Sequence, residues 1–193
     1  DGFPNATLVS DSWAAQLKTP AKNHQLCLAH LLRELNFFHQ MYNIKWVASM
    51  KDILARAIKL KNRMQPEQYD QPFKERSDLL IEFYALIDQV IPEKYSKILP
   101  FQKRLKKRKQ EVFNFLFYPH VPYHNNASER AIRNLKVKQK VSGGFRSERG
   151  AEIFAILRSV IDTIIKKGGN PSESLRFAIN VATCKNELSA IQT

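Results

Sequence analysis

The sequence predicts a predominantly helical chain with one short strand near its start. Apolar residues recur at helical spacing over most of the 193 residues. Prolines and a Gly-Gly pair fall between the periodic stretches, where they would end helices. One run of β-branched and apolar residues, "ATLVSD", differs from the rest and stops abruptly at Asp11, as a strand would.

The first helices are predicted from the segments that follow this strand. Residues 23–39, "NHQLCLAHLLRELNFFH", carry leucines near helical spacing, and residues 46–64 continue in the same style. Two prolines then interrupt the chain, and residues 73–91 have the pattern of a third helix.

A fourth helical stretch is predicted from Pro92 to about Phe117, interrupted or kinked near Pro100. The segment "YPHVPYHNN" then breaks the pattern. Asn125 or Asn126 is suited to cap a helix that starts "ASERAIRNLKV".

The last two helices follow a turn-rich segment, "VSGGFRSERG". The long apolar stretch "AEIFAILRSVIDTIIKKGG" predicts a helix that stops at Gly168 and Gly169. Pro171 then opens a last helix that runs through about Thr183.

The charge balance indicates a polyanionic partner. The chain has 31 Lys plus Arg against 18 Asp plus Glu, a net charge of +13, which favours nucleic acid over an anionic membrane surface. No apolar run approaches the roughly 18 residues of a spanning helix, and no signal peptide opens the chain. We therefore expect no membrane partner and a cytoplasmic protein. Cys27 and Cys184 show no disulfide framework, and we expect both to be reduced.

Two acidic residues each allow two interpretations. Asp11, at the end of a strand, could bind a metal ion, because a sheet holds such a carboxylate rigidly at a crevice. It could equally cap the following turn. Glu129 is the lone acid in an otherwise basic segment, residues 123–140. In a first helical turn it would complement the helix dipole and pair with Arg133, so it need not be a metal ligand.

Cys27 and His30 would lie on one face of the predicted helix, with His24 one step further back. A zinc site completed by His120 and His124 is one interpretation. The alternative is a buried thiol beside a hydrogen-bonded core histidine. We favour it because a single Cys-x-x-His lacks the paired spacing of ordinary zinc sites.

Basic residues gather in two places. The run "KRLKKRK" has six basic residues among seven, and it is either a phosphate-binding surface or a solvated helix face. Its candidates for DNA contact are Lys103, Arg104, Lys106 and Lys107. The second group surrounds Glu129, where a basic surface beside a metal-binding acid could hold and cleave a phosphodiester. Its members are Arg130, Arg133, Lys136, Lys138 and Lys140.

Three segments carry a family resemblance: "LVSDSWAA", "HQLCLAHLLREL" and "HNNASERAIRNLKVKQKVSGGFRSERGAEIFAILRSVIDT". Together they resemble the DDE transposases of bacterial insertion sequences, specifically the insertion-sequence-sixty-six (IS66) family. The resemblance runs from about Leu8 to Asn180, and it is weakly diagnostic between roughly residues 40 and 118.

The resemblance implies the C-terminal part of a ribonuclease-H-like α/β catalytic domain with a large all-helical insertion. Residues 1–39 would belong to the catalytic core, residues 40–118 would form the insertion, and residues 119–193 would return to the core. The distance between the two acids, 129 − 11 = 118 residues, supports an insertion, since a direct connection would be far shorter.

The resemblance also assigns roles to single residues. Asp11 matches the second acid of the catalytic triad, and Glu129 matches the third. Cys27 and His30 match a Cys-or-Asp, two-residue, His element, which together with Asn126 would support the active site from behind its metal ligands.

The first acid of the triad has no match in this chain. Asp1 is only ten residues before Asp11 and lies in a Gly-Pro-containing turn. The resemblance therefore places the first acid, the opening strands and any DNA-recognition region upstream. We expect the chain alone to be catalytically incomplete and inactive.

For the intact enzyme, the resemblance implies DNA cleavage at the ends of the element, followed by strand transfer into a target. Three carboxylates would hold two Mg²⁺ (or Mn²⁺) ions roughly 3.5–4 Å apart. The partners would be transposon-end and target DNA, bound by a homo-oligomer. Two alternatives stay open: a non-catalytic basic helical DNA-binding remnant, and a ribonuclease-H-like nuclease that cuts without joining.

Overall fold

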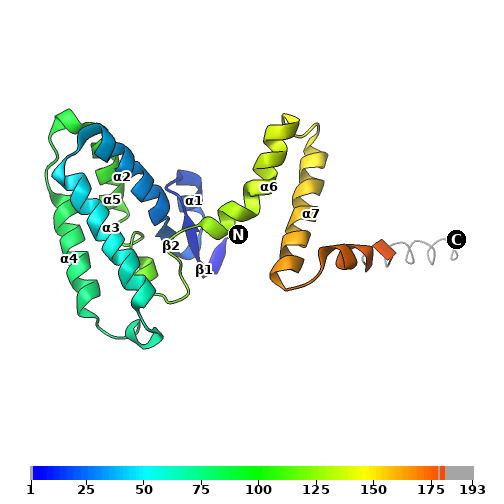
Figure 1. Ribbon diagram of the computed structural model, residues 1–193, viewed down its shortest axis with the longest axis horizontal. Coiled ribbons are helices and arrows are strands. Elements are labelled where there is room, and N and C mark those ends of the chain that lie inside the picture. Colours follow the sequence, from blue (N-terminus) through cyan, green and yellow to red (C-terminus); the bar gives the residue numbers. More distant parts are fainter. Residues whose placement is uncertain (1, 178, 181–193) are drawn as a thin grey trace. The chain divides into compact units, whose positions relative to one another are not determined.

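The computed structural model, shown in Figure 1, describes residues 2–177 and 179–180. The chain forms two compact units, which comprise residues 1–125 and residues 126–193. The first unit contains both strands and helices α1 to α5, and the second contains α6 and α7.

Two parallel strands form a small sheet in the first unit. β1 (Phe3–Ser10) and β2 (Ala21–Leu26) are joined by the short helix α1 (Ala14–Lys18), and the last four residues of each strand are paired one to one. The pairing is irregular earlier in β1, where Pro4 has no backbone N–H to donate. Because the strands are parallel, both carboxyl ends lie at the same end of the sheet.

The strand β2 corrects the predicted helix from Asn23, because the helix, α2 (Leu28–Tyr42), begins only at Leu28. Hydrogen bonds from a distant segment stabilise the extended conformation. The fully buried Gln25 donates from Nε2 to the Val112 carbonyl (3.0 Å) and accepts at Oε1 from the Phe115 N–H (2.8 Å). The local periodicity of residues 21–26 could not reveal these partners, which lie nearly 90 residues later in the chain.

Helices α2, α3 (Lys45–Arg63) and α4 (Lys74–Asp88) pack side by side, with the 3₁₀ turn η1 (Pro66–Gln68) between α3 and α4. α3 and α4 lie close to their predicted bounds. The Trp46 indole N–H donates to the Leu86 carbonyl (2.9 Å) and so links α3 to α4. One continuous core runs from the sheet through these helices. Its largest fully buried side chains are Phe83, Phe101, Phe113, Phe115, Leu26, Leu28, Leu31, Leu35, Met50, Ile53, Leu54 and Ile87.

The fourth helix is shorter in the structure than in the prediction. After the 3₁₀ turn η2 (Glu93–Tyr95), α5 (Ile98–Lys107) ends within the basic run, and the chain continues through turns and η3 (Asn114–Leu116). The expected extension to Phe117 is therefore wrong. Pro100 does not kink the helix, because it lies in the first turn, where a backbone N–H has no intrahelical acceptor.

The second unit contains a helical hairpin, formed by the two helices that the sequence predicts on either side of the turn-rich segment. α6 (Asn126–Ser142) and α7 (Glu148–Lys166) are joined by a turn in which Gly143 and Gly144 have φ of 67° and 123°, a region that favours glycine. The Ser147 hydroxyl accepts a hydrogen bond from the third residue of α7 and caps that helix.

A further helical segment covers residues 171–177 and 179–180. The Asn170 side chain accepts a hydrogen bond from the Ser172 N–H (3.0 Å) at its start. The predicted end of this helix at Thr183 lies outside the described residues, as does Cys184.

The prediction of a predominantly helical chain is confirmed. The division into residues 1–39, 40–118 and 119–193 stays a prediction, and the boundary between the two units follows Asn125. Cys27 is a buried free thiol. Within the described part of the chain, no helix has the length and apolar character needed to cross a membrane.

Candidate functional site

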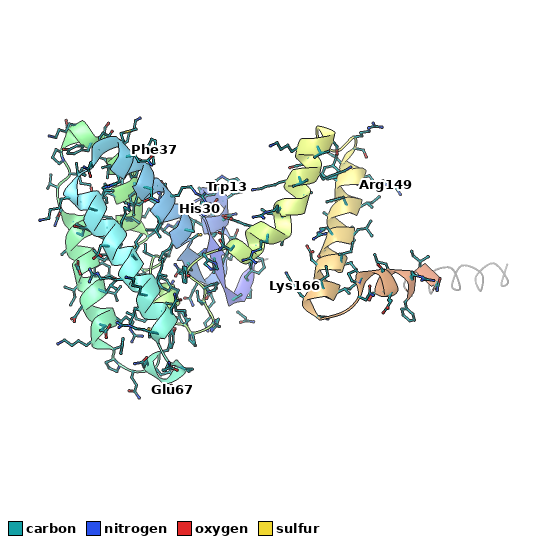
Figure 2. The ribbon with its side chains drawn as sticks, in the orientation of Figure 1. Trp13, His30, Phe37, Glu67, Arg149 and Lys166 are labelled. Atoms are coloured by element: carbon teal, nitrogen blue, oxygen red, sulfur yellow. The ribbon has the colours of Figure 1, made fainter. Side chains whose placement is uncertain are left out.

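Asp11 lies directly beyond β1, at the carboxyl end of the sheet. Its Oδ1 accepts a hydrogen bond from the backbone N–H of Trp13 (3.0 Å), so the predicted capping of the turn is confirmed. The Asp11 side chain is half-buried, and Trp13 beside it is 65% exposed (Figure 2). A carboxylate has lone pairs on both oxygens, so this bond leaves capacity for a metal ion.

Three segments of the first unit meet at this end of the sheet. The Cys27 N–H donates to the carbonyl of Ser10 (2.7 Å), and the Leu28 N–H donates to the carbonyl of Tyr123 (2.8 Å). Tyr123 is three residues before the start of α6. The approach to α6 is therefore fixed beside the ends of both strands.

These segments bury polar atoms that have no hydrogen-bond partner among the described residues: Ser12 Oγ, His124 Nδ1 and Asn125 Oδ1. An unsatisfied buried polar atom costs about 1–3 kcal/mol, so such atoms normally have a partner. Ser12 follows Asp11 in the chain, and His124 and Asn125 follow Tyr123, whose carbonyl accepts from Leu28. The segments that meet here therefore offer polar atoms to a ligand. The sequence suggests Asn125 only as a helix cap, and its side-chain oxygen does not form that bond.

The structure keeps Cys27 and His30 together but separates His24 from them. Cys27 precedes the first residue of α2 and is 1% exposed, and the His30 N–H donates to the Cys27 carbonyl (3.1 Å). His24 lies on β2 instead of on the helix, which corrects the prediction of a shared face. The described residues contain no group of three or more His, Cys, Asp or Glu side chains that could hold a metal ion, so the zinc interpretation gains no support.

Glu129 lies in the first turn of α6, as predicted, and is half-buried. Arg133, Lys136 and Lys140 follow at intervals of four, three and four residues, which places all four side chains on one face of the helix. The three basic residues are exposed. Lys138 falls on the opposite side by the same geometry. α6 therefore carries an acid followed by a line of cations, the basic line.

Asp11 belongs to the first unit and Glu129 to the second. Their joint binding of a metal ion stays a prediction. Asn126, which the resemblance assigns to the support of the site, is the first residue of α6.

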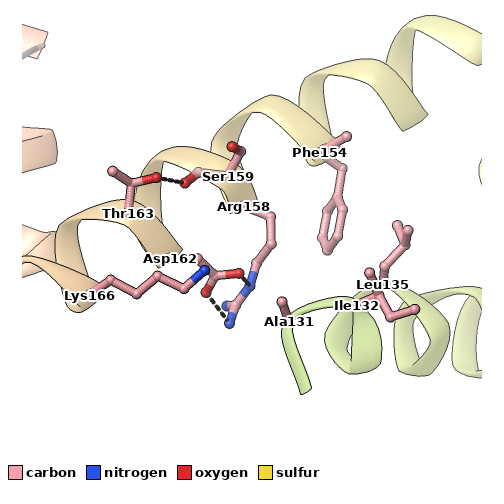
Figure 3. Close-up of a pocket in the computed structure, with 10 residues that line it drawn as sticks. Ala131, Ile132, Leu135, Phe154, Arg158, Ser159, Asp162, Thr163 and Lys166 are labelled. Atoms are coloured by element: carbon pink, nitrogen blue, oxygen red, sulfur yellow. Dashed lines mark hydrogen bonds and ion pairs between the residues drawn. The ribbon is translucent and has the colours of Figure 1, made fainter. Parts of the chain in front are cut away.

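α6 and α7 enclose a hollow of about 300 Å³ (Figure 3). Leu135 of α6 and Phe154 of α7 line its apolar end. Toward the other end, two contacts to Asp162 orient Arg158: Nε–Oδ2 at 3.2 Å and Nη2–Oδ1 at 2.8 Å. Lys166 lines the same hollow.

A neighbouring hollow of about 280 Å³ brings Arg130 of α6 together with Arg158 and Lys166 of α7. With Asp162 this group has a formal charge of 3 − 1 = +2. Sequence reasoning identified Arg130 but missed the two α7 cations, because they lie 28 and 36 positions after Arg130 and only the hairpin brings them close.

The basic run at the end of α5 is partly engaged within the first unit. Arg104 Nη2 contacts both carboxylate oxygens of Glu34 (2.6 and 2.7 Å). Lys106 pairs with Asp88 (3.4 Å). Ion pairing makes Arg104 less available for phosphate than the remaining predicted contacts of this run. These are Lys103 and Lys107, which are exposed.

Comparison with protein families matches residues 1–153 to a family described as "Transposase IS66 family". The chain is also 27% identical, over 172 residues, to the uncharacterized protein y4jO of Sinorhizobium fredii (strain NBRC 101917 / NGR234). That match covers 85% of this chain and 49% of the relative, so the chain spans about half the length of the curated relative it matches. No solved structure matches the chain. The region matched by the family includes Asp11 and Glu129.

Proposed function

Because the chain belongs to the IS66 transposase family, we propose that it contributes two carboxylates, Asp11 and Glu129, to a site that cleaves and joins DNA strands. The family membership supports DNA as the substrate. The third carboxylate of such a site would come from elsewhere in the whole natural protein.

The convergence of segments at the carboxyl end of the sheet is the observation that carries this proposal. Asp11 follows β1 at this place, and the bond between Leu28 and Tyr123 (2.8 Å) holds the approach to α6 there. Only six residues separate Tyr123 from Glu129. We propose that Asp11, at a strand end, and Glu129, six positions after Tyr123, serve one site.

The residues fit Mg²⁺ or Mn²⁺ ions. Hard divalent cations prefer oxygen ligands, and carboxylates are foremost among these. Asp11 keeps coordinating capacity beyond its capping bond, and the unsatisfied polar atoms of Ser12, His124 and Asn125 lie on the adjoining segments. When bound, two such ions activate a water or a 3′-hydroxyl and stabilise the leaving oxygen at phosphorus. Asp11 and Glu129 would hold them.

We propose a ribonuclease-H-like arrangement for the sheet. A parallel β–α–β unit with an acid at the end of its first strand agrees with it. In the described residues β1 pairs with β2 alone, whereas parallel strands normally belong to larger, covered sheets. Cys27 and His30 would position the ends of the strands, because the Cys27 N–H holds the Ser10 carbonyl beside Asp11.

The basic line of α6 would hold the DNA backbone. Arg133, Lys136 and Lys140 continue along the face on which Glu129 lies, so they would neutralise phosphates next to the metal-binding acid. Arg130 would act together with Arg158 at the neighbouring hollow. A homo-oligomer assembled on paired DNA ends is part of this proposal.

The experiment replaces each acid by its amide in the whole natural protein, as Asp11→Asn and Glu129→Gln, with Mg²⁺ and element-end DNA. We expect cleavage to fall to background while DNA binding persists, because the amide keeps the shape but not the charge. Glu152→Gln on α7, where the side chain is exposed, is the matched control and keeps full activity.

Each outcome separates the proposal from its rivals. Cleavage that is unaffected by Glu129→Gln would contradict the assignment of Glu129 as a metal ligand. Nicked strands without joined product would identify a nuclease. Binding without any cleavage by the unsubstituted protein would identify a non-catalytic remnant.

A further inference from the structure

Lys61 of α3 is enclosed by backbone carbonyls of the segment that leads to α6. Its Nζ donates to the carbonyl oxygens of Phe115 (2.8 Å), Tyr118 (2.9 Å) and Pro119 (3.0 Å). The ring centroid of Tyr69 lies 4.7 Å from the same nitrogen. An ammonium has three donor hydrogens, so every one of them has an acceptor here.

The cage holds a cation through carbonyl dipoles and an aromatic ring. Within the residues that the structure describes, no carboxylate pairs with Lys61. Burial lowers the pKa of its ammonium to about 8, which reflects the cost of removing a charge from water. An apolar side chain at position 61 would avoid that cost. The hydrogen bonds to the three carbonyls therefore explain the presence of a lysine here better than packing does.

The segment 115–125 is attached to three other parts of the first unit. The Phe115 N–H donates to Gln25 of β2 (2.8 Å). The buried Arg76 of α4 donates to the Leu116 carbonyl (3.2 Å). The Tyr123 carbonyl accepts from the start of α2. Lys61 adds hydrogen bonds from α3 to three carbonyls of this segment within five residues.

We propose that Lys61 is a positioning residue of the DNA-processing site: it fixes the segment 115–125, from which the chain continues into α6 and Glu129. The inference rests on the role proposed for Glu129. By this inference α3, which lies in the region where the family resemblance is weakest, helps to position the site.

The first test is Lys61→Met in the whole natural protein, a change that keeps the buried stem and removes the charge. We expect amide hydrogen exchange in residues 115–125 to accelerate on the order of tenfold, while the core amides of α3 keep their protection. The kcat for strand cleavage should fall about tenfold with the KM for DNA within about twofold, because the site is misaligned and the DNA surface is intact. Lys59→Ala, an exposed lysine of the same helix, should change neither readout.

The second test is chemical rescue. Lys61→Ala shortens the side chain and leaves the three carbonyls without their donor, and n-propylammonium supplies an ammonium on a stem of suitable length. We expect it to restore part of the lost cleavage and the slow exchange of residues 115–125. n-Propanol has the same length without the charge and should restore neither.

Three results would overturn the inference: a Lys61→Met protein as active as the unsubstituted one, exchange that accelerates equally across the first unit, or rescue by n-propanol as good as by n-propylammonium. If Glu129→Gln leaves cleavage intact, the proposed function fails. Exchange in residues 115–125 still decides, independently, whether Lys61 holds this segment.

Discussion

Two helices of equal length differ sharply between the two units. α3 and α7 each contain 19 residues and each has an apolar stripe. α3 buries seven side chains, from Trp46 to Leu60, whereas α7 buries none. On α7, Ile156 is 56% exposed and Leu157 is 49% exposed. Amphipathic periodicity is therefore common to both helices, but burial is not.

Neighbouring elements account for the difference. α3 packs against α2, α4 and η3 and lies inside a continuous core, whereas within its own unit α7 borders α6 across an open hollow. Most helical stability in proteins comes from packing of the apolar face and not from intrinsic propensity. The first unit thus carries the stability of the described chain, and the hairpin carries the basic surface proposed for DNA.

The largest expected contrast is between core and hairpin truncations. Phe83→Ala should lower the free energy of unfolding by about 3–5 kcal/mol, because this fully buried ring packs against Phe113 at 4.8 Å between centroids. Ile156→Ala, on the exposed side of α7, should change it by less than about 1 kcal/mol. Urea unfolding followed by circular dichroism measures both. Equal losses in the free energy of unfolding would show that the apolar side chains of the hairpin stabilise the protein as much as those of the first unit.

Loss of a polar side chain should also cost more stability in the first unit than in the hairpin. Gln25→Leu leaves the Phe115 N–H and the Val112 carbonyl without their side-chain partner, and we expect a loss of about 2–4 kcal/mol in the free energy of unfolding. Gln139→Leu on α6, where the side chain is exposed, should change it by at most about 0.5 kcal/mol. A neutral Gln25→Leu would contradict the role given to Gln25 in forming β2.

A smaller effect is expected when one ion pair of the first unit is compared with one of the second. The two-oxygen contact of Arg104 with Glu34 should show a coupling free energy of about 0.5–1 kcal/mol in a double-mutant cycle. The Arg158–Asp162 pair, four residues apart on α7, should show about 0.3–0.5 kcal/mol. Urea unfolding measures the first and hydrogen exchange of α7 amides the second. A stronger coupling in the hairpin would reverse the comparison.

The last comparison concerns the pH dependence that Lys61 gives to the free energy of unfolding. Its pKa is lowered by burial to about 8 in the folded protein, so between about pH 8 and the ordinary lysine value the unfolded chain binds more protons. The free energy of unfolding should therefore rise with pH across this window. Lys61→Met should abolish this rise. Burial raises the pKa of the neighbouring Tyr69, which acts in the opposite sense at higher pH, so the comparison is made below about pH 9.5.

A stability that falls between pH 8 and 9.5 in the unsubstituted protein alone would contradict the lowered pKa of Lys61. The same slope in both proteins would assign the effect to another group.

Much of the helical layout could be read from the sequence. α3, α4, α6 and α7 have strong periodicity and clear stop signals, and β1 has a distinct composition ending at Asp11. β2 could not be predicted in the same way, because its sequence, "AKNHQL", is polar and its stability comes from residues 111–115. The end of α5 at Lys107 escaped prediction too. The turn after it brings the Glu111 carbonyl to the Leu26 N–H (2.8 Å), a contact that the helical pattern does not reveal.

Some residues of the candidate site could be recognised from the sequence, and others only from the structure. Asp11, Glu129 and the basic residues of α6 stand out in the sequence by residue type, spacing and family resemblance. Arg158, Lys61 and the unsatisfied side chains of Ser12 and His124 do not.

The sequence by itself determined the helical class and the family and singled out the two candidate acids, because these follow from local periodicity and from residues close together along the chain. Only the tertiary structure decided which side chains are buried and what holds the approach to α6. The reason is physical: the contact between Leu28 and Tyr123 and the carbonyl cage of Lys61 join residues more than 50 positions apart. Such contacts contribute free energy only once the intervening elements have packed.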